Sequence, residues 1–127
     1  MVIMRLLYSS EKVKNRCTKY REACKMLGGD KKLALHLLNR IEDIGIENSL
    51  QSIIKQSGKY RFHKLYNKGG NEREGYFAID VKSSKEPWRI VISLLDENAQ
   101  EFHPCNVDEI MDEVVYLRIE EVSYHYE

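Results

Sequence analysis

Residues 9–44 read SSEKVKNRCTKYREACKMLGGDKKLALHLLNRIEDI, and this segment decides the fold class. Apolar side chains recur every three or four residues on both sides of Gly28-Gly29-Asp30. That spacing places them on one face of an α-helix. The two glycines are typical of a helix end, and the aspartate is typical of a helix start. We therefore predict two helices, over about residues 11–27 and 31–44, joined as an antiparallel hairpin.

Beyond residue 57 the spacing of the apolar residues changes to two, which is typical of strands. Strand-like runs cover residues 60–66, 75–82, 88–95 and 114–122, and short helical turns are expected at 49–55 and 107–111. The apolar start, Met1–Tyr8, predicts one further strand. Strands before and after a helical hairpin predict an α+β fold, in which an antiparallel sheet carries the hairpin on one face. We expect one domain over residues 1–127.

The charges are divided unevenly along a chain whose formal net charge is zero. Residues 1–73 contain 16 Lys or Arg and 7 Asp or Glu, whereas residues 74–127 contain 4 and 13. Such asymmetry is typical of proteins that meet a polyanion on one side. Composition alone nevertheless favours two halves that interleave in space and neutralise each other.

Motifs for metals, cofactors and membranes are missing from the sequence. Cys17, Cys24 and Cys105 have no metal-ligand spacing, and we expect them to be reduced thiols of the core. Neither a zinc motif, a phosphate loop nor a nucleophile elbow is present, so we expect neither metal nor cofactor. No apolar run approaches the roughly 20 residues of a membrane span. Because Arg5 interrupts the short apolar start, we expect no signal peptide and a cytoplasmic location.

Strand alternation predicts which side chains face away from the helices. In the middle strand Phe77, Ile79 and Val81 should meet the hairpin. The same parity gathers a set of cationic and aromatic side chains on one exposed concave surface: Arg61, His63, Tyr76 and Arg89. Cations interleaved with rings suit single-stranded RNA, since charges follow phosphates and rings stack on bases. A solvated strand and loop would have the same composition.

Four segments in order resemble landmarks of the HigB branch of the RelE/ParE toxin superfamily. They are Phe62-His63-Lys64-Leu65, Arg73-Glu74-Gly75-Tyr76-Phe77-Ala78-Ile79, Trp88-Arg89-Ile90-Val91 and Tyr124-His125. The predicted helical hairpin ahead of them also fits this family.

The resemblance implies a toxin of a type II toxin–antitoxin system that acts as a metal-independent, ribosome-dependent mRNA endonuclease. The implied catalytic residues are His125, Arg89, Arg73 and His63. The implied RNA-binding residues are Lys68, Lys64, Arg61, Tyr76 and Tyr124, with Lys68 and Lys64 as rivals for one position. The implied partners are a HigA-like helix-turn-helix antitoxin, mRNA on the ribosome, and operator DNA through the antitoxin only. An acidic antitoxin segment would dock on the cations of the first helix, which are Lys12, Lys14, Arg16, Lys19, Arg21 and Lys25.

Metal-free RNA cleavage uses the 2′-hydroxyl as nucleophile on the adjacent phosphate. Histidine suits the proton transfers, each of which contributes about 10²–10⁴-fold to the rate. Arginine suits the negative charge that develops on phosphorus oxygens. We assign proton transfer to His125, with His63 as its partner or as a contact to the RNA backbone. The alternatives are a ParE-like toxin that binds DNA gyrase without nuclease chemistry and a non-catalytic interaction domain.

Overall fold

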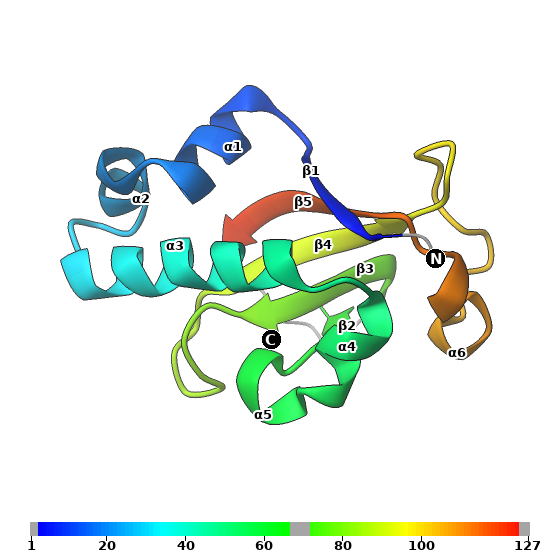
Figure 1. Ribbon diagram of the computed structural model, residues 1–127. Helices are drawn as coiled ribbons and strands as arrows, with labels where there is room; N and C mark the ends of the chain where they lie inside the picture. Colours follow the sequence, from blue (N-terminus) through cyan, green and yellow to red (C-terminus); the bar gives the residue numbers. More distant parts are fainter. Residues whose placement is uncertain (1–2, 67–71, 125–127) are drawn as a thin grey trace.

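The protein is described by a computed structural model that covers residues 3–66 and 72–124, with residues 66 and 72–74 described by their backbone alone. Its elements follow in chain order (Figure 1). They are β1 (Arg5–Tyr8), α1 (Glu11–Thr18), α2 (Tyr20–Met26), α3 (Lys31–Ile46), α4 (Leu50–Lys55), α5 (Ser57–Tyr60), β2 (His63–Tyr66), β3 (Glu72–Asp80), β4 (Arg89–Leu95), α6 (Val107–Ile110), the 3₁₀ turn η1 (Met111–Glu113) and β5 (Tyr116–Ser123).

The strands form one sheet in the order β1-β5-β4-β3-β2. The pairs β2–β3, β3–β4 and β4–β5 are antiparallel, whereas β1 runs parallel to β5. The α+β class is confirmed, but the expectation of a purely antiparallel sheet is wrong at this edge. The helices carry the chain from the edge strand β1 across to the opposite edge strand β2 (Figure 1). Because β1 is thus not joined to its sheet neighbour β5 by a hairpin, the two strands are free to run parallel.

The helices cover one face of the sheet, as the hairpin predicts. One core cluster joins Leu37 and Ile41 of α3 to Phe77 and Ile79 of β3 and to Ile90 of β4. Burying each such side chain contributes about 1.5–3 kcal/mol. The predicted parity of the middle strand is therefore confirmed.

The first arm of the hairpin is not one helix. Lys19 has φ −115° and ψ 119°, an extended conformation that separates α1 from α2. The Thr18 hydroxyl donates to the Lys14 carbonyl at 2.7 Å, a bond that competes with regular helical pairing. The break rotates α2, so that Ala23 is fully buried while Tyr20 is 41% exposed.

The strand predicted over residues 60–66 begins later than the alternation of its side chains suggests. Tyr60 ends α5 with its ring fully buried, and its hydroxyl donates to Glu47 at 3.0 Å. Arg61 follows in the left-handed region with φ 47°, and the strand starts at His63. Tyr60 is thus part of the core, because burial of a large ring outweighs the local preference for a strand.

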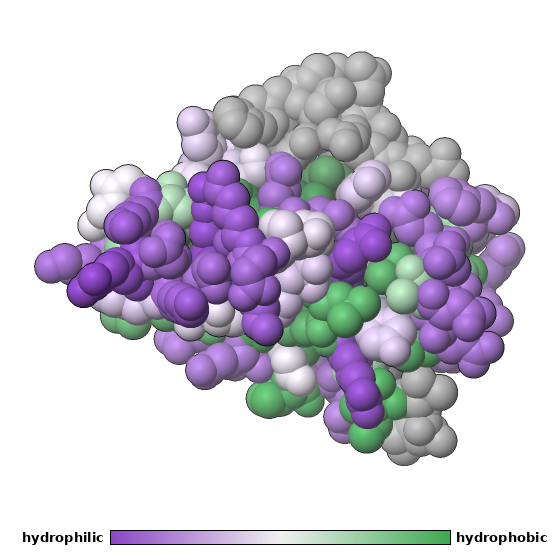
Figure 2. All heavy atoms as spheres, turned by 90° about the horizontal axis from the view of Figure 1, so that it is seen from above, coloured by the Kyte–Doolittle hydropathy of each residue, from purple (hydrophilic) through white to green (hydrophobic). Residues whose placement is uncertain are grey.

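Opposite charges collect at opposite ends of the molecule rather than interleaving. Lys12, Lys14, Lys19, Arg21 and Lys25 are exposed on α1, α2 and the residue between them. Residues 96–113 hold seven acidic and no Lys or Arg side chains, and they surround α6 at the other end (Figure 1). Figure 2 shows hydrophilic side chains crowded over the end that holds α1 and α2. The expected neutralisation of the two halves is therefore wrong at these two ends.

Among the helices that the structure describes, none has the length and apolar character that a membrane crossing requires.

Candidate functional site

The face of the sheet opposite α3, here called the far face, carries most of the predicted side chains. In the β2–β3 register His63 lies opposite Ala78, and in the β3–β4 register Asp80 lies opposite Arg89. Tyr76 shares the face with Ala78 and Asp80 because alternate residues of a strand point to one side. The prediction that His63, Tyr76 and Arg89 share one side of the sheet is thus confirmed.

Arg61 reaches the far face from outside any strand and binds Asp80 in a bidentate pair. Its Nε donates to Asp80 Oδ2 at 2.6 Å, and its Nη2 donates to Oδ1 at 2.9 Å. The Asp80 side chain is 3% exposed, whereas the Arg61 side chain is 39% exposed. Asp80 therefore fixes a guanidinium whose other side faces solvent.

Arg89 lies on the second side of the same carboxylate, with its Nε 3.3 Å from Asp80 Oδ1. Its terminal nitrogens donate to the carbonyl oxygens of Ser83, Ser84, Glu86 and Trp88. Burial lowers the pKa of Arg89, and the Asp80 carboxylate opposes that shift. Arg61, Asp80 and Arg89 together carry one net positive charge.

The expectation that Arg89 is exposed is wrong, since the residue is 5% exposed. Alternation predicts the side of the sheet but not the depth of burial. The chain from 82 to 88 folds over the side chain, and its carbonyl oxygens accept the guanidinium protons. Arg89 thus holds the connection between β3 and β4.

His63 lies beside this group. Its Nδ1 is in hydrogen-bond contact with the carbonyl oxygen of Arg61. Because a carbonyl oxygen only accepts, the ring carries a proton on Nδ1. The neutral ring then has its basic nitrogen at Nε2, and the ring orientation is coupled to the backbone of Arg61.

The middle of the far face is apolar. Leu65, Ala78 and Val91 form a small buried cluster, and the half-buried Tyr76 packs against it. The Tyr76 ring is therefore part of a packed surface.

A second ionic group on the far face was missed by the sequence reasoning. The Arg118 Nε donates to Glu120, which also accepts from the Ser93 hydroxyl at 2.6 Å. The hydrogen bond from Arg118 to Glu120 raises the pKa of Arg118. The register places Arg118 opposite Ser93, and alternation with the buried Leu117 and Ile119 could have assigned it to this face.

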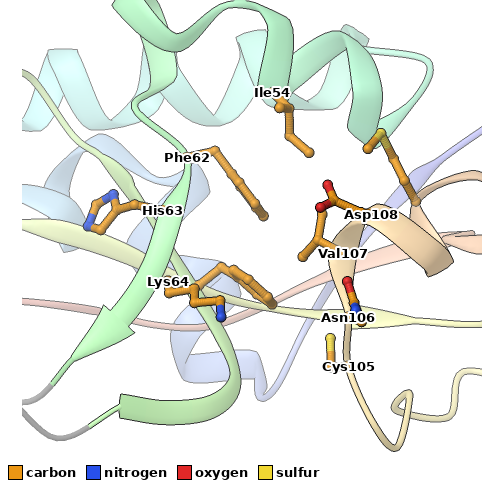
Figure 3. A pocket seen from close by; sticks show the side chains of 10 residues that line it. Ile54, Phe62, His63, Lys64, Cys105, Asn106, Val107 and Asp108 are labelled. Atoms are coloured by element: carbon orange, nitrogen blue, oxygen red, sulfur yellow. The ribbon is translucent and has the colours of Figure 1, made fainter.

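Lys64 is separated from the other predicted RNA-binding residues. The register places it opposite Phe77, whose ring packs in the core under the helices. It lines a pocket of about 470 Å³ between α4, β2 and α6. In Figure 3, Ile54 and Phe62 point into this pocket, whereas His63 points away from it. Lys64 thus lies on the helix-covered side of β2, and it does not share the far face with Arg61, His63 and Tyr76.

Three further predicted residues cannot be placed. Lys68 and His125 lie outside the described residues, and Arg73 belongs to β3 by its backbone only. Tyr124 is described and lies against Trp88, with ring centroids 4.8 Å apart.

Within residues 3–66 and 72–124, no group of three or more His, Cys, Asp or Glu side chains could hold a metal ion. No protein-family model, curated protein or solved structure matches this chain.

Proposed function

We propose that this protein is the toxin of a type II toxin–antitoxin pair of the RelE/ParE superfamily, and that it cleaves ribosome-bound mRNA without a metal. The observation that carries the proposal is the pair of Arg61 and His63 on the far face. A buried carboxylate orients the arginine, and the arginine's own carbonyl orients the histidine. A fixed cation beside an imidazole is the combination that phosphate-ester cleavage requires.

In the proposed reaction the RNA 2′-oxygen attacks phosphorus and the bond from phosphorus to the 5′-oxygen breaks. The 2′-hydroxyl proton goes to a base, and an acid supplies a proton to the leaving 5′-oxygen. His125 performs one transfer, and His63 assists it or contacts the RNA backbone. The products are a 2′,3′-cyclic phosphate and a 5′-hydroxyl.

Charge stabilisation on the phosphate falls to Arg61 rather than Arg89 in this proposal. Arg61 offers a partly exposed guanidinium, whereas the terminal nitrogens of Arg89 already donate to backbone carbonyls. Arg73 and Lys68 remain sequence-based candidates for further phosphate contacts.

The proposed partner is a helix-turn-helix antitoxin in the same cytoplasm, which would also link the toxin to operator DNA. Its acidic segment would dock on the exposed cations of α1 and α2. Among the described residues, the one ion pair made by these cations joins Lys25 to Glu22 at 3.8 Å within α2. The cations are thus presented to a partner, and salt would weaken the attraction.

The test compares growth arrest and mRNA cleavage by four forms of the protein in a bacterial host. His125→Ala and Arg61→Gln should each lose about 10²-fold or more in cleavage. His36→Ala, which removes an exposed histidine from α3, should behave as wild type. The melting temperature of each variant separates lost chemistry from lost folding.

One observation favours the ParE-like alternative. Arg61, Arg89 and Arg118 each pair with a carboxylate of this chain, which reduces the positive charge that these three arginines offer to an RNA backbone. Full toxicity of both His125→Ala and Arg61→Gln, together with inhibited gyrase supercoiling, would overturn the nuclease proposal in favour of this alternative.

A further inference from the structure

A cleft of about 370 Å³ separates the helices α1 and α2 from the adjacent ends of β4 and β5. Its volume falls within the range of small-molecule sites. It is lined by residues of α1, α2 and β5 and by two rings that flank the strands, Trp88 just before β4 and Tyr124 just after β5. The full lining is Arg16, Lys25, Met26, Trp88, Val122, Ser123 and Tyr124.

Two rings form a corner in this cleft. The planes of Trp88 and Tyr124 meet at 65°, with centroids 4.8 Å apart. Trp88 is half-buried against the core, whereas Tyr124 is 46% exposed. Edge-to-face packing holds both rings in place, so a planar group that enters meets a prepared aromatic surface.

Two cations line the same cleft. Arg16 is half-buried on α1, and Lys25 is exposed on α2. The Lys25–Glu22 pair is long and largely exposed, so it holds Lys25 only weakly and an anion can replace it. The acidic residues 96–113 lie at the other end of the molecule (Figure 1).

The cleft adjoins the candidate site. Trp88 directly precedes Arg89, and Ser123 lies opposite Arg89 in the β4–β5 register. The cleft therefore borders the strand ends that carry Arg89, whose neighbour Asp80 binds Arg61.

We propose that the cleft is a subsite for single-stranded RNA, in which one base stacks on the Trp88–Tyr124 corner. Arg16 and Lys25 bind the phosphates that flank this base. The inference rests on the proposed function in taking RNA as the substrate. Stacking platforms beside cations are how proteins hold single strands without reading their sequence. An acidic peptide would satisfy the cations but offers no base to stack on the two rings.

The single tryptophan of the chain is the reporter. The full-length protein is titrated with an octauridylate whose 2′-oxygens are methylated, so that 2′-oxygen attack is blocked and binding alone is measured. A base stacked at the corner should quench Trp88 fluorescence. An oligoglutamate of equal charge serves as the base-free anion and should leave the fluorescence unchanged.

Two variants distinguish the contribution of phosphate contacts to RNA binding from that of base stacking. Arg16→Gln with Lys25→Gln should weaken binding about tenfold or more and lower the salt slope of log K by about 1.4, from about 0.7 per lost contact. Tyr124→Leu should weaken binding about tenfold and keep the slope. The matched control, Lys31→Gln with Lys32→Gln, removes the same charge from exposed positions of α3 and should retain quenching and slope.

Three results would overturn the subsite. The first is that the oligonucleotide does not quench Trp88 fluorescence in the wild-type protein, and the second is that the double variant and its control lose equal binding affinity. The third is that oligoglutamate quenches as strongly as the oligonucleotide, which would point to an acidic protein segment instead. Because this assay contains neither ribosomes nor cleavable RNA, failure of the nuclease proposal would leave its result intact.

Discussion

Replacing Asp80 by Asn tests the account of the far face by a measurement of stability. The carboxylate is 3% exposed and faces the guanidinium groups of Arg61 and Arg89. An amide of the same shape removes the negative charge, and Arg89, itself 5% exposed, loses the carboxylate that lies 3.3 Å from its Nε. The expected result is a large loss of folding free energy.

The magnitude follows from the burial of the two pairs. Removing one partner of a buried ion pair typically costs about 3–5 kcal/mol, and the Asp80–Arg89 pair is of this kind. The Arg61 side chain is 39% exposed, so solvent screening reduces its share and Arg61→Gln should cost about 1 kcal/mol or less. For a domain of this size, 3 kcal/mol corresponds to a melting temperature lowered by about 10 °C.

The assay is urea unfolding followed by circular dichroism, with equal slopes in all variants as the condition for comparison. Asp112→Asn, at an exposed position of η1, is the control and should stay within about 0.5 kcal/mol of wild type. If Asp80→Asn also stays within about 1 kcal/mol of wild type, the carboxylate does not hold the two arginines together.

Two further predictions concern ionisable groups away from the far face. Burial raises the pKa of the Cys17 thiol to about 12. At pH 8 iodoacetamide should therefore modify Cys17 far more slowly than the half-buried Cys105, and peptide mass spectrometry can measure both rates. Equal rates would refute the burial of Cys17. Hydrogen bonds from the Ser52 hydroxyl and neighbouring groups lower the pKa of Glu47 below its ordinary value of 4.5. The ionised Glu47 carboxylate therefore contributes its full share of folding stability above about pH 4.5, and this share is lost as the pH falls through the lowered pKa. Glu47→Gln should therefore flatten the acid side of the stability profile, and an unchanged profile would show that these bonds do not contribute.

Much of the fold could be predicted because the signals are local. The glycines at 28 and 29 have φ +70° and +88°, and they end the first arm as their position suggests. Alternation in β3 and β4 also assigns the two faces correctly. The break at Lys19 could not be predicted, since an uninterrupted helical pattern runs through it and tertiary packing of Ala23 decides the rotation of α2.

The candidate site was only half predictable for a related reason. Alternation places His63, Tyr76 and Arg89 on one side, but it says nothing about which partner each side chain finds. Asp80 organises the group by a contact that spans 19 residues of the chain, and Arg89 is covered by the connection that precedes it. Contacts of this range depend on the assembled sheet, not on any local spacing.

The chemical nature of the cut ends tests the central claim most directly. Wild-type protein is added to a translating cell-free system, and the cleaved mRNA is recovered and its termini are analysed. Attack by the 2′-oxygen predicts 5′-hydroxyl ends and 2′,3′-cyclic phosphates or their opened monophosphates. Ends that carry 5′-phosphate and 3′-hydroxyl groups, or mRNA that stays intact while growth stops, would contradict the account.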